Sequence, residues 1–193
     1  MLGIFLDIEA NGLDMDIHKP LSIAIKIVNL TTGSHLAFLE SMINISSADW
    51  ERSSPESLNI NGIKKDMLQE APTIENVKAN IVQLFTKLSI DRKTAVFICQ
   101  NPSFDRAFFH KIISATEQEA AQWPYHWLDL ASMFWSKQMA KAPPFPWDFG
   151  ISKNSIAATY HLSKETLPHT AMGGVDHLIK CYQAVVGFPS LKN

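Results

Sequence analysis

A short apolar run near the start of the chain, residues 3–8, limits the fold more than any other feature of the sequence. This run is typical of a buried central strand. Within residues 21–28, large aliphatic side chains alternate with small or polar ones. This period of two predicts a half-exposed strand. A turn-forming TTGS follows, and residues 35–43 are the expected return strand. The chain is therefore expected to open with three strands in an antiparallel meander.

The remaining sequence alternates expected helices with short strands. Residues 44–72 are rich in Ser, Asn and Pro, with one short helix expected at 64–69, and Thr73 is expected to cap a helix. Short strands are expected at 94–99 and 127–130, and helices from about residue 103 and at 131–139, 155–162 and 175–186. The Pro-rich residues 142–147 predict a stiff loop that is not helical. This order predicts an α/β layered domain with a mixed sheet.

Composition narrows the classes of protein that the chain can belong to. The 193 residues are enough for one domain, expected to span 1–193. With 17 basic and 19 acidic side chains, the net charge of −2 excludes an overall cationic coat for nucleic acid. Cys99 and Cys181 lie far apart in apolar surroundings, which favours reduced thiols in a cytoplasmic protein. The sequence shows neither a signal peptide nor an apolar stretch of about 18 residues, so no membrane association is expected.

Two carboxylates close to the first strand are the first candidate functional residues. Asp7 and Glu9 are two residues apart, so on a strand they lie on the same face of the sheet. Two acids on one face of an apolar strand are costly unless a cation or protons offset their repulsion. The alternative is that both lie at the end of the strand and are solvated there.

Two further segments add candidates. Asp105 follows a buried strand and lies in the first turn of an expected helix, where acids are also favoured by the helix dipole alone. His169 lies in a loop before Asp176, and Pro168 and the pair Gly173–Gly174 disfavour helix before residue 175. A loop histidine beside an acid suits proton transfer, but His161 and His177 are not distinguished from it by local sequence.

Together these residues suggest a metal site. Four carboxylates and one histidine, with no cysteine, match the oxygen-rich donor set of two Mg²⁺ or Mn²⁺ ions. Two such ions stabilise the attacking and leaving oxygens of a displacement at phosphorus.

Five segments in order resemble the DnaQ-like 3′–5′ exonucleases of the DEDDh group, in the ribonuclease H-like superfamily. FLDIEANGLD resembles the first motif, QNPSFDRAFF the second and HTAMGGVDHL the third. INGIKKDMLQEAPTIENV and WLDLASMFW resemble segments that connect the motifs in this family. Met172 stands where the tyrosine branch of the family has Tyr, which favours the histidine branch. The resemblance covers residues 3 to about 186.

The resemblance implies a three-layer ribonuclease H-like fold with a mixed sheet of about five strands flanked by helices. It implies that the metal ligands are Asp7, Glu9, Asp105 and Asp176. His169 would be the general base, and the residues bordering the 3′-terminal nucleotide would be Leu13, Asn101 and Phe104. The implied activity is metal-dependent hydrolysis of the 3′-terminal phosphodiester of single-stranded DNA or RNA, which releases nucleoside 5′-monophosphates. Asp129 also matches a family position but is interpreted as structural.

Two departures from the family pattern keep other functions open. The family spacing is H-x-A-x-x-D, whereas Asp176 follows His169 by seven residues; the two glycines would have to loop out to restore the usual geometry. Ala10 and Asn11 stand where the family often has Thr. The alternatives are a catalytically weak or inactive module of the same fold that binds nucleic acid or protein, and a metal-dependent phosphatase or small-nucleotide hydrolase. A homodimer is a further expectation.

Overall fold

A five-stranded mixed sheet forms the centre of the protein. The structure, a computed structural model, describes residues 1–191. The strands are β1 (Leu2–Ala10), β2 (Pro20–Asn29), β3 (His35–Met42), β4 (Ala95–Cys99) and β5 (Trp127–Asp129). Their order across the sheet is β3-β2-β1-β4-β5. β1 pairs antiparallel with β2, which pairs antiparallel with β3, whereas β4 pairs parallel with β1 and with β5. The expected meander followed by parallel strands is confirmed.

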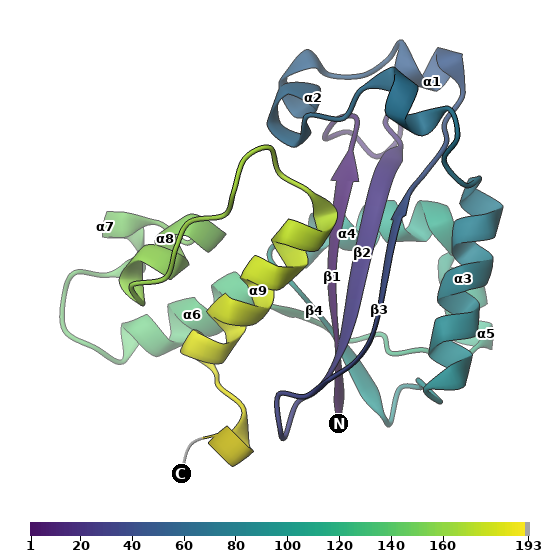
Figure 1. The fold of residues 1–193 in the computed structure, drawn as a ribbon. Coiled ribbons are helices and arrows are strands. Elements are labelled where there is room, and N and C mark those ends of the chain that lie inside the picture. The colour runs from purple at the N-terminus through teal and green to yellow at the C-terminus, as the bar shows by residue number, and fades with distance from the viewer. Residues whose placement is uncertain (192–193) are drawn as a thin grey trace.

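Helices cover both faces of the sheet and give the expected three layers (Figure 1). The α-helices are α1 (Ser47–Trp50), α2 (Pro55–Asn61), α3 (Ile74–Lys87), α4 (Pro102–Ile112), α5 (Ala115–Ala120), α6 (Leu130–Met139), α7 (Pro146–Phe149), α8 (Lys153–Thr159) and α9 (Ala171–Val185). Two 3-10 helices are η1 (Lys65–Leu68) and η2 (Pro189–Leu191). Helices α3 and α4 lie against one face of the sheet and α9 against the other, while α1 and α2 lie beyond the end of β1 (Figure 1).

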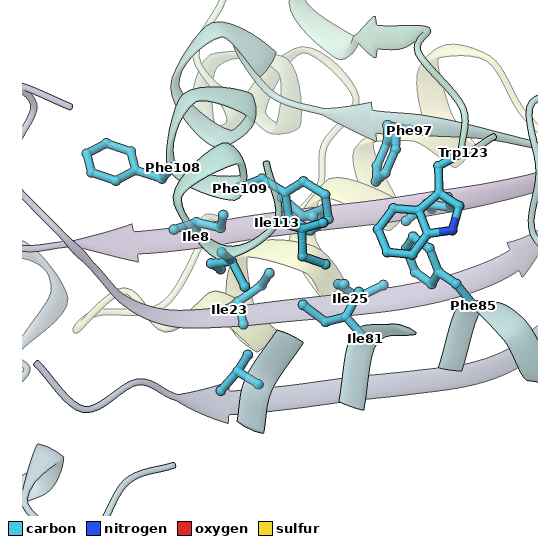
Figure 2. Packing of buried hydrophobic residues seen from close by; sticks show 14 of the residues in the cluster. Ile8, Ile23, Ile25, Ile81, Phe85, Phe97, Phe108, Phe109, Ile113 and Trp123 are labelled. Carbon is cyan, nitrogen blue, oxygen red and sulfur yellow. The ribbon is translucent and has the colours of Figure 1, made fainter. Parts of the chain in front are cut away.

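The alternation of side chains along β1 divides the core in two. Ile4, Leu6 and Ile8 face the layer of α3 and α4, where they pack with Phe85, Phe109 and other apolar residues (Figure 2). Phe5 faces the opposite layer and packs with residues of α6, α8 and α9. Asp7 and Glu9 have the same parity as Phe5, so they lie on the α9 side of the sheet.

Several local expectations are wrong in detail. The segment 44–72 contains α1 and α2 as well as η1, α5 was not expected, and α7 begins inside the Pro-rich segment because proline is tolerated at the first helical positions. The important difference is α9, which begins at Ala171 and not near residue 175. Thr170 caps it: its hydroxyl accepts a hydrogen bond from the Gly173 amide at 3.1 Å, and its carbonyl accepts one from the Gly174 amide at 2.8 Å. Both glycines are therefore helical and do not loop out.

Cys99 and Cys181 are buried free thiols. Among residues 1–191, no helix is long and apolar enough to cross a membrane. The assignment of 1–193 to one domain and the cytoplasmic location stay predictions.

Candidate carboxylate site at the edge of the sheet

The candidate site lies where the parallel strands end. β1, β4 and β5 run in the same direction, so their carboxyl ends meet at one edge, where open α/β folds bind ligands. Asp7 and Glu9 lie near the end of β1. The chain leaves β4 at Cys99 and enters α4 at Pro102, which brings Asp105 to the same edge.

Asp105 is fixed against β1 by a backbone hydrogen bond. The pairing between β1 and β4 ends at Phe5 and Ile98, so the Ile8 amide lies beyond this ladder. That amide donates to Oδ1 of Asp105 at 3.0 Å, which satisfies a buried backbone donor. Burial, and after it the nearby charge of Asp7, raise the pKa of the Asp105 carboxyl well above its ordinary value. The site therefore favours the neutral form of this acid.

A lysine ammonium lies between two carboxylates of this site. Lys153, the first residue of α8, places Nζ 3.0 Å from Oδ1 of Asp7 and 3.3 Å from Oε2 of Glu165. The three side chains are 15%, 14% and 3% exposed, respectively. Burial by itself lowers the pKa of Lys153, but the charges of Asp7 and Glu165 outweigh it and raise this pKa above its ordinary value. Lys153 is therefore a buried cation held by two acids.

Burial also acts on the acids of β1. It raises the pKa of Asp7, and the Lys153 ammonium offsets this only in part. Burial followed by the charge of Asp7 raises the pKa of Glu9 to about 7. His169 lies close enough for its charge to lower the pKa of Asp7, while its amide donates to the carbonyl of Ile60 at 3.1 Å. Asp7, Glu9, Asp105, Glu165 and His169 thus share one electrostatic environment around Lys153.

Residues 4–180 match the family model RNase_T, described as exonuclease. The chain belongs to this exonuclease family. No curated protein matched the sequence significantly.

Solved exonucleases share the fold of this exonuclease-family chain. An exonuclease I structure superposes with a TM-score of 0.74 at 15% identity, over 96% of this chain and 41% of that one. Cell-death related nuclease 4 gives 0.72 at 13% identity, over 94% of this chain and 62% of that one. A 3′-exonuclease that recognises the histone mRNA stem-loop gives 0.71 at 12% identity, over 97% and 65%. The chain thus spans about two fifths of the exonuclease I that it resembles.

The third exonuclease motif is the part of the site that departs from expectation. Counted from His169, the family pattern H-x-A-x-x-D places its aspartate at residue 174, which here is glycine. A Cβ built on Gly174 would lie 2.3 Å from Oδ2 of Asp7, so α9 approaches β1 at this position without a side chain. Asp176 is two residues further along, which rotates it by about 200° around the helix.

Asp176 makes a different contact from the one expected. Its carboxylate pairs with the ammonium of Lys26 on β2, and its side chain is 44% exposed. The structure therefore brings Asp7, Glu9, Asp105 and His169 together and places the carboxylate of Asp176 over the neighbouring strand.

The remaining predicted residues surround this edge. Leu13, in the turn after β1, is 80% exposed. Asn101 precedes α4 in a left-handed conformation, and its amide donates to Oδ1 of Asp129 at 3.0 Å. Asp129 also accepts hydrogen bonds from the amides of Ala131 and Ser132, so its contacts are those of a helix cap. Phe104 is half-buried and packs against the core.

The expected pair of divalent ions does not fit the residues as the structure places them. Within residues 1–191, no group of three or more His, Cys, Asp or Glu side chains is arranged to hold a metal ion. The Lys153 ammonium contacts Asp7 directly, and Gly174 offers no ligand. Sequence reasoning missed Lys153 and Glu165 because neither belongs to a motif. The available signal was glycine at residue 174, where the third motif of the family has aspartate.

Proposed function

We propose that this domain binds the 3′ end of single-stranded nucleic acid and does not cleave it by the two-metal route. Membership of the exonuclease family supports the choice of ligand. So do the folds of exonuclease I from E. coli in complex with a dT13 oligonucleotide and of the 3′-exonuclease that recognises an mRNA stem-loop. The contact of Lys153 with Asp7, together with glycine at position 174, carries the proposal that cleavage is absent.

The charges of the site are compatible with an approaching phosphate. Lys153 offsets one of the two carboxylates that it contacts. The raised pKa values of Glu9 and Asp105 favour their neutral forms. A phosphate therefore meets less negative charge than four ionised acids would present. Exposed Leu13 offers an apolar surface to a terminal base at the same edge.

Hydrolysis is a second candidate, favoured by the convergence of Asp7, Glu9, Asp105 and His169. In this candidate the domain would release nucleoside 5′-monophosphates in the presence of Mg²⁺ or Mn²⁺, with His169 accepting the proton of the attacking water. Asp176 would take no part as a ligand in the arrangement that the structure shows.

A cleavage assay separates the two candidates. A 5′-labelled single-stranded oligonucleotide, DNA or RNA, is incubated with the wild-type protein and with Asp7→Asn, in Mg²⁺ and in Mn²⁺. We expect no 3′ laddering above the level of the variant. A ladder from the 3′ end that Asp7→Asn abolishes would establish hydrolysis instead.

A binding assay tests the ligand. Fluorescence anisotropy of a labelled linear oligonucleotide is measured with linear and with circular single-stranded competitors of equal length. End recognition predicts that the linear competitor is the stronger one, because the circle has no 3′ end. Leu13→Ser should weaken binding several-fold. The control is Val82→Ser, which changes an exposed apolar side chain of α3 away from the site and should leave binding unchanged. Equal competition by both forms would refute end recognition.

A further inference from the structure

The local structure of α8 fixes the backbone position of Lys153 in the site. Ser152 caps the helix by accepting the Ser155 amide at 3.1 Å, which fixes Lys153 at the first helical position. The next residue, Asn154, accepts the Glu165 amide through Oδ1 at 2.9 Å. Lys153 therefore contacts the carboxylate of Glu165, and the next residue, Asn154, binds its backbone amide.

The ammonium of Lys153 has the surroundings of a bound cation. Its nitrogen lies within 3.0–3.4 Å of Oδ1 of Asp7 and of both carboxylate oxygens of Glu165. All three side chains are largely buried, so solvent screens these charges little. A divalent ion at Asp7 would have to displace this ammonium or lie beside it, and the second arrangement is opposed by like charge.

Gly174 completes this arrangement on the opposite side of Asp7. Its position against Oδ2 leaves no room for a side chain while Asp7 keeps its present conformation. One oxygen of Asp7 thus contacts Lys153, and the other contacts the backbone of α9. The Asp7 carboxylate therefore lies between the Lys153 ammonium and the backbone of α9.

We propose that Lys153 acts as a built-in cation of this site, with Asp7 and Glu165 as its partners, and that the native domain is indifferent to divalent metal ions. Glu165 then contributes the further carboxylate that the family resemblance implies for Asp176. A further consequence, which rests on the proposed function, is that nucleic-acid binding needs no divalent ion.

Mn²⁺ alone tests the central claim, since no nucleic acid is involved. Binding is followed by the loss of the electron paramagnetic resonance signal of free Mn²⁺, and in parallel by the change in Tm with MnCl₂. The wild-type protein should bind no Mn²⁺ at this site. Lys153→Gln frees the carboxylates and should bind Mn²⁺ with an affinity at least about tenfold above any residual binding of the wild-type protein. Lys153→Arg keeps a cation and should behave as the wild type does.

Two outcomes would overturn the claim. One is Mn²⁺ binding by the wild-type protein that Asp7→Asn removes, because a metal ion then displaces Lys153. The other is a folded Lys153→Gln variant that binds no more Mn²⁺ than the wild type does, because Lys153 then does not stand in a cation position. In the double variant Asp7→Asn/Lys153→Gln the gained binding should disappear. If Lys153→Gln does not fold, the wild-type and Asp7→Asn measurements still decide the claim.

A separate arm addresses nucleic acid. Wild-type binding of the labelled oligonucleotide should be the same in EDTA and in Mg²⁺ at matched ionic strength. Loss of binding in EDTA would contradict the built-in cation, whereas absence of binding under both conditions would contradict the proposed function and leave the Mn²⁺ result standing.

Discussion

The backbone of Gly174 lies directly against the carboxylate of Asp7, so that an added Cβ would come within 2.3 Å of Oδ2 and 2.6 Å of Cγ. Replacing a glycine inside a helix by alanine ordinarily gains about 1 kcal/mol. Here the sign should reverse, because Lys153 holds Asp7 on its other side. Gly174→Ala is expected to lower the free energy of unfolding by about 1–3 kcal/mol, as overpacking does, when measured by urea denaturation.

A double-mutant cycle isolates the cause of that loss. With Asp7→Ala as the background, the carboxylate is gone and Gly174→Ala should cost much less than it does in the wild type. An equal cost in both backgrounds would show that contacts other than Asp7 limit the approach of α9.

The ion pair of Asp176 and the buried contact of Glu165 should differ in their energetic weight. Asp176 is 44% exposed, so its pairing with Lys26 is well screened and Asp176→Asn should cost under about 1 kcal/mol. Glu165 is 3% exposed, and Glu165→Gln weakens a hydrogen bond to a charged group, which costs about 1.5–3 kcal/mol. Chemical denaturation of both variants at one pH provides the comparison. A larger loss of stability for Asp176→Asn than for Glu165→Gln would contradict the view that the buried contact of Glu165 stabilises the protein more than the exposed ion pair of Asp176.

Much of the fold could be predicted because it depends on local patterns. The strand at β2 and the Thr73 cap of α3 each follow from a few neighbouring residues. The expectation that β2 is half-exposed was wrong, because helices cover both faces of the sheet and bury both sets of its side chains. The convergence of Asp7, Glu9 and Asp105 follows from strand order and from the rule that parallel strands end at one edge.

The third motif could not be predicted in the same way. Glycine propensity argued against helix at residues 173 and 174, but the Thr170 cap and the burial of Gly174 and Val175 outweigh it. The contact of Lys153 with Asp7 joins residues 146 positions apart, and no local pattern encodes such a distance. Where a helix begins decides which face each residue occupies, so an error of four residues at α9 changed the environment expected for Asp176.

Glu9 should make the protein less stable as the pH rises. Its pKa is raised from 4.5 to about 7, so between these values the folded state binds more protons than the unfolded state. The contribution of Glu9 to the free energy of unfolding is fully present below about pH 4.5. It is lost as the pH rises through 7, by at most about 3 kcal/mol. Glu9→Gln should flatten this part of the pH profile of Tm and raise Tm at pH 8. The exposed Glu70→Gln serves as control, and the same profile for both variants would contradict the burial of charge at Glu9.

Asp105 combines a raised pKa with a hydrogen bond that a neutral side chain can also accept. Asp105→Asn keeps an oxygen for the Ile8 amide and cannot ionise, so at pH 8 this variant should be at least as stable as the wild type. Asp105→Leu leaves the buried amide without its acceptor and should cost about 1–3 kcal/mol. Unfolding of both variants by urea at pH 8 measures the difference. A strongly destabilised Asp105→Asn would mean that the ionised carboxylate itself stabilises this edge of the sheet, contrary to the effect of its burial.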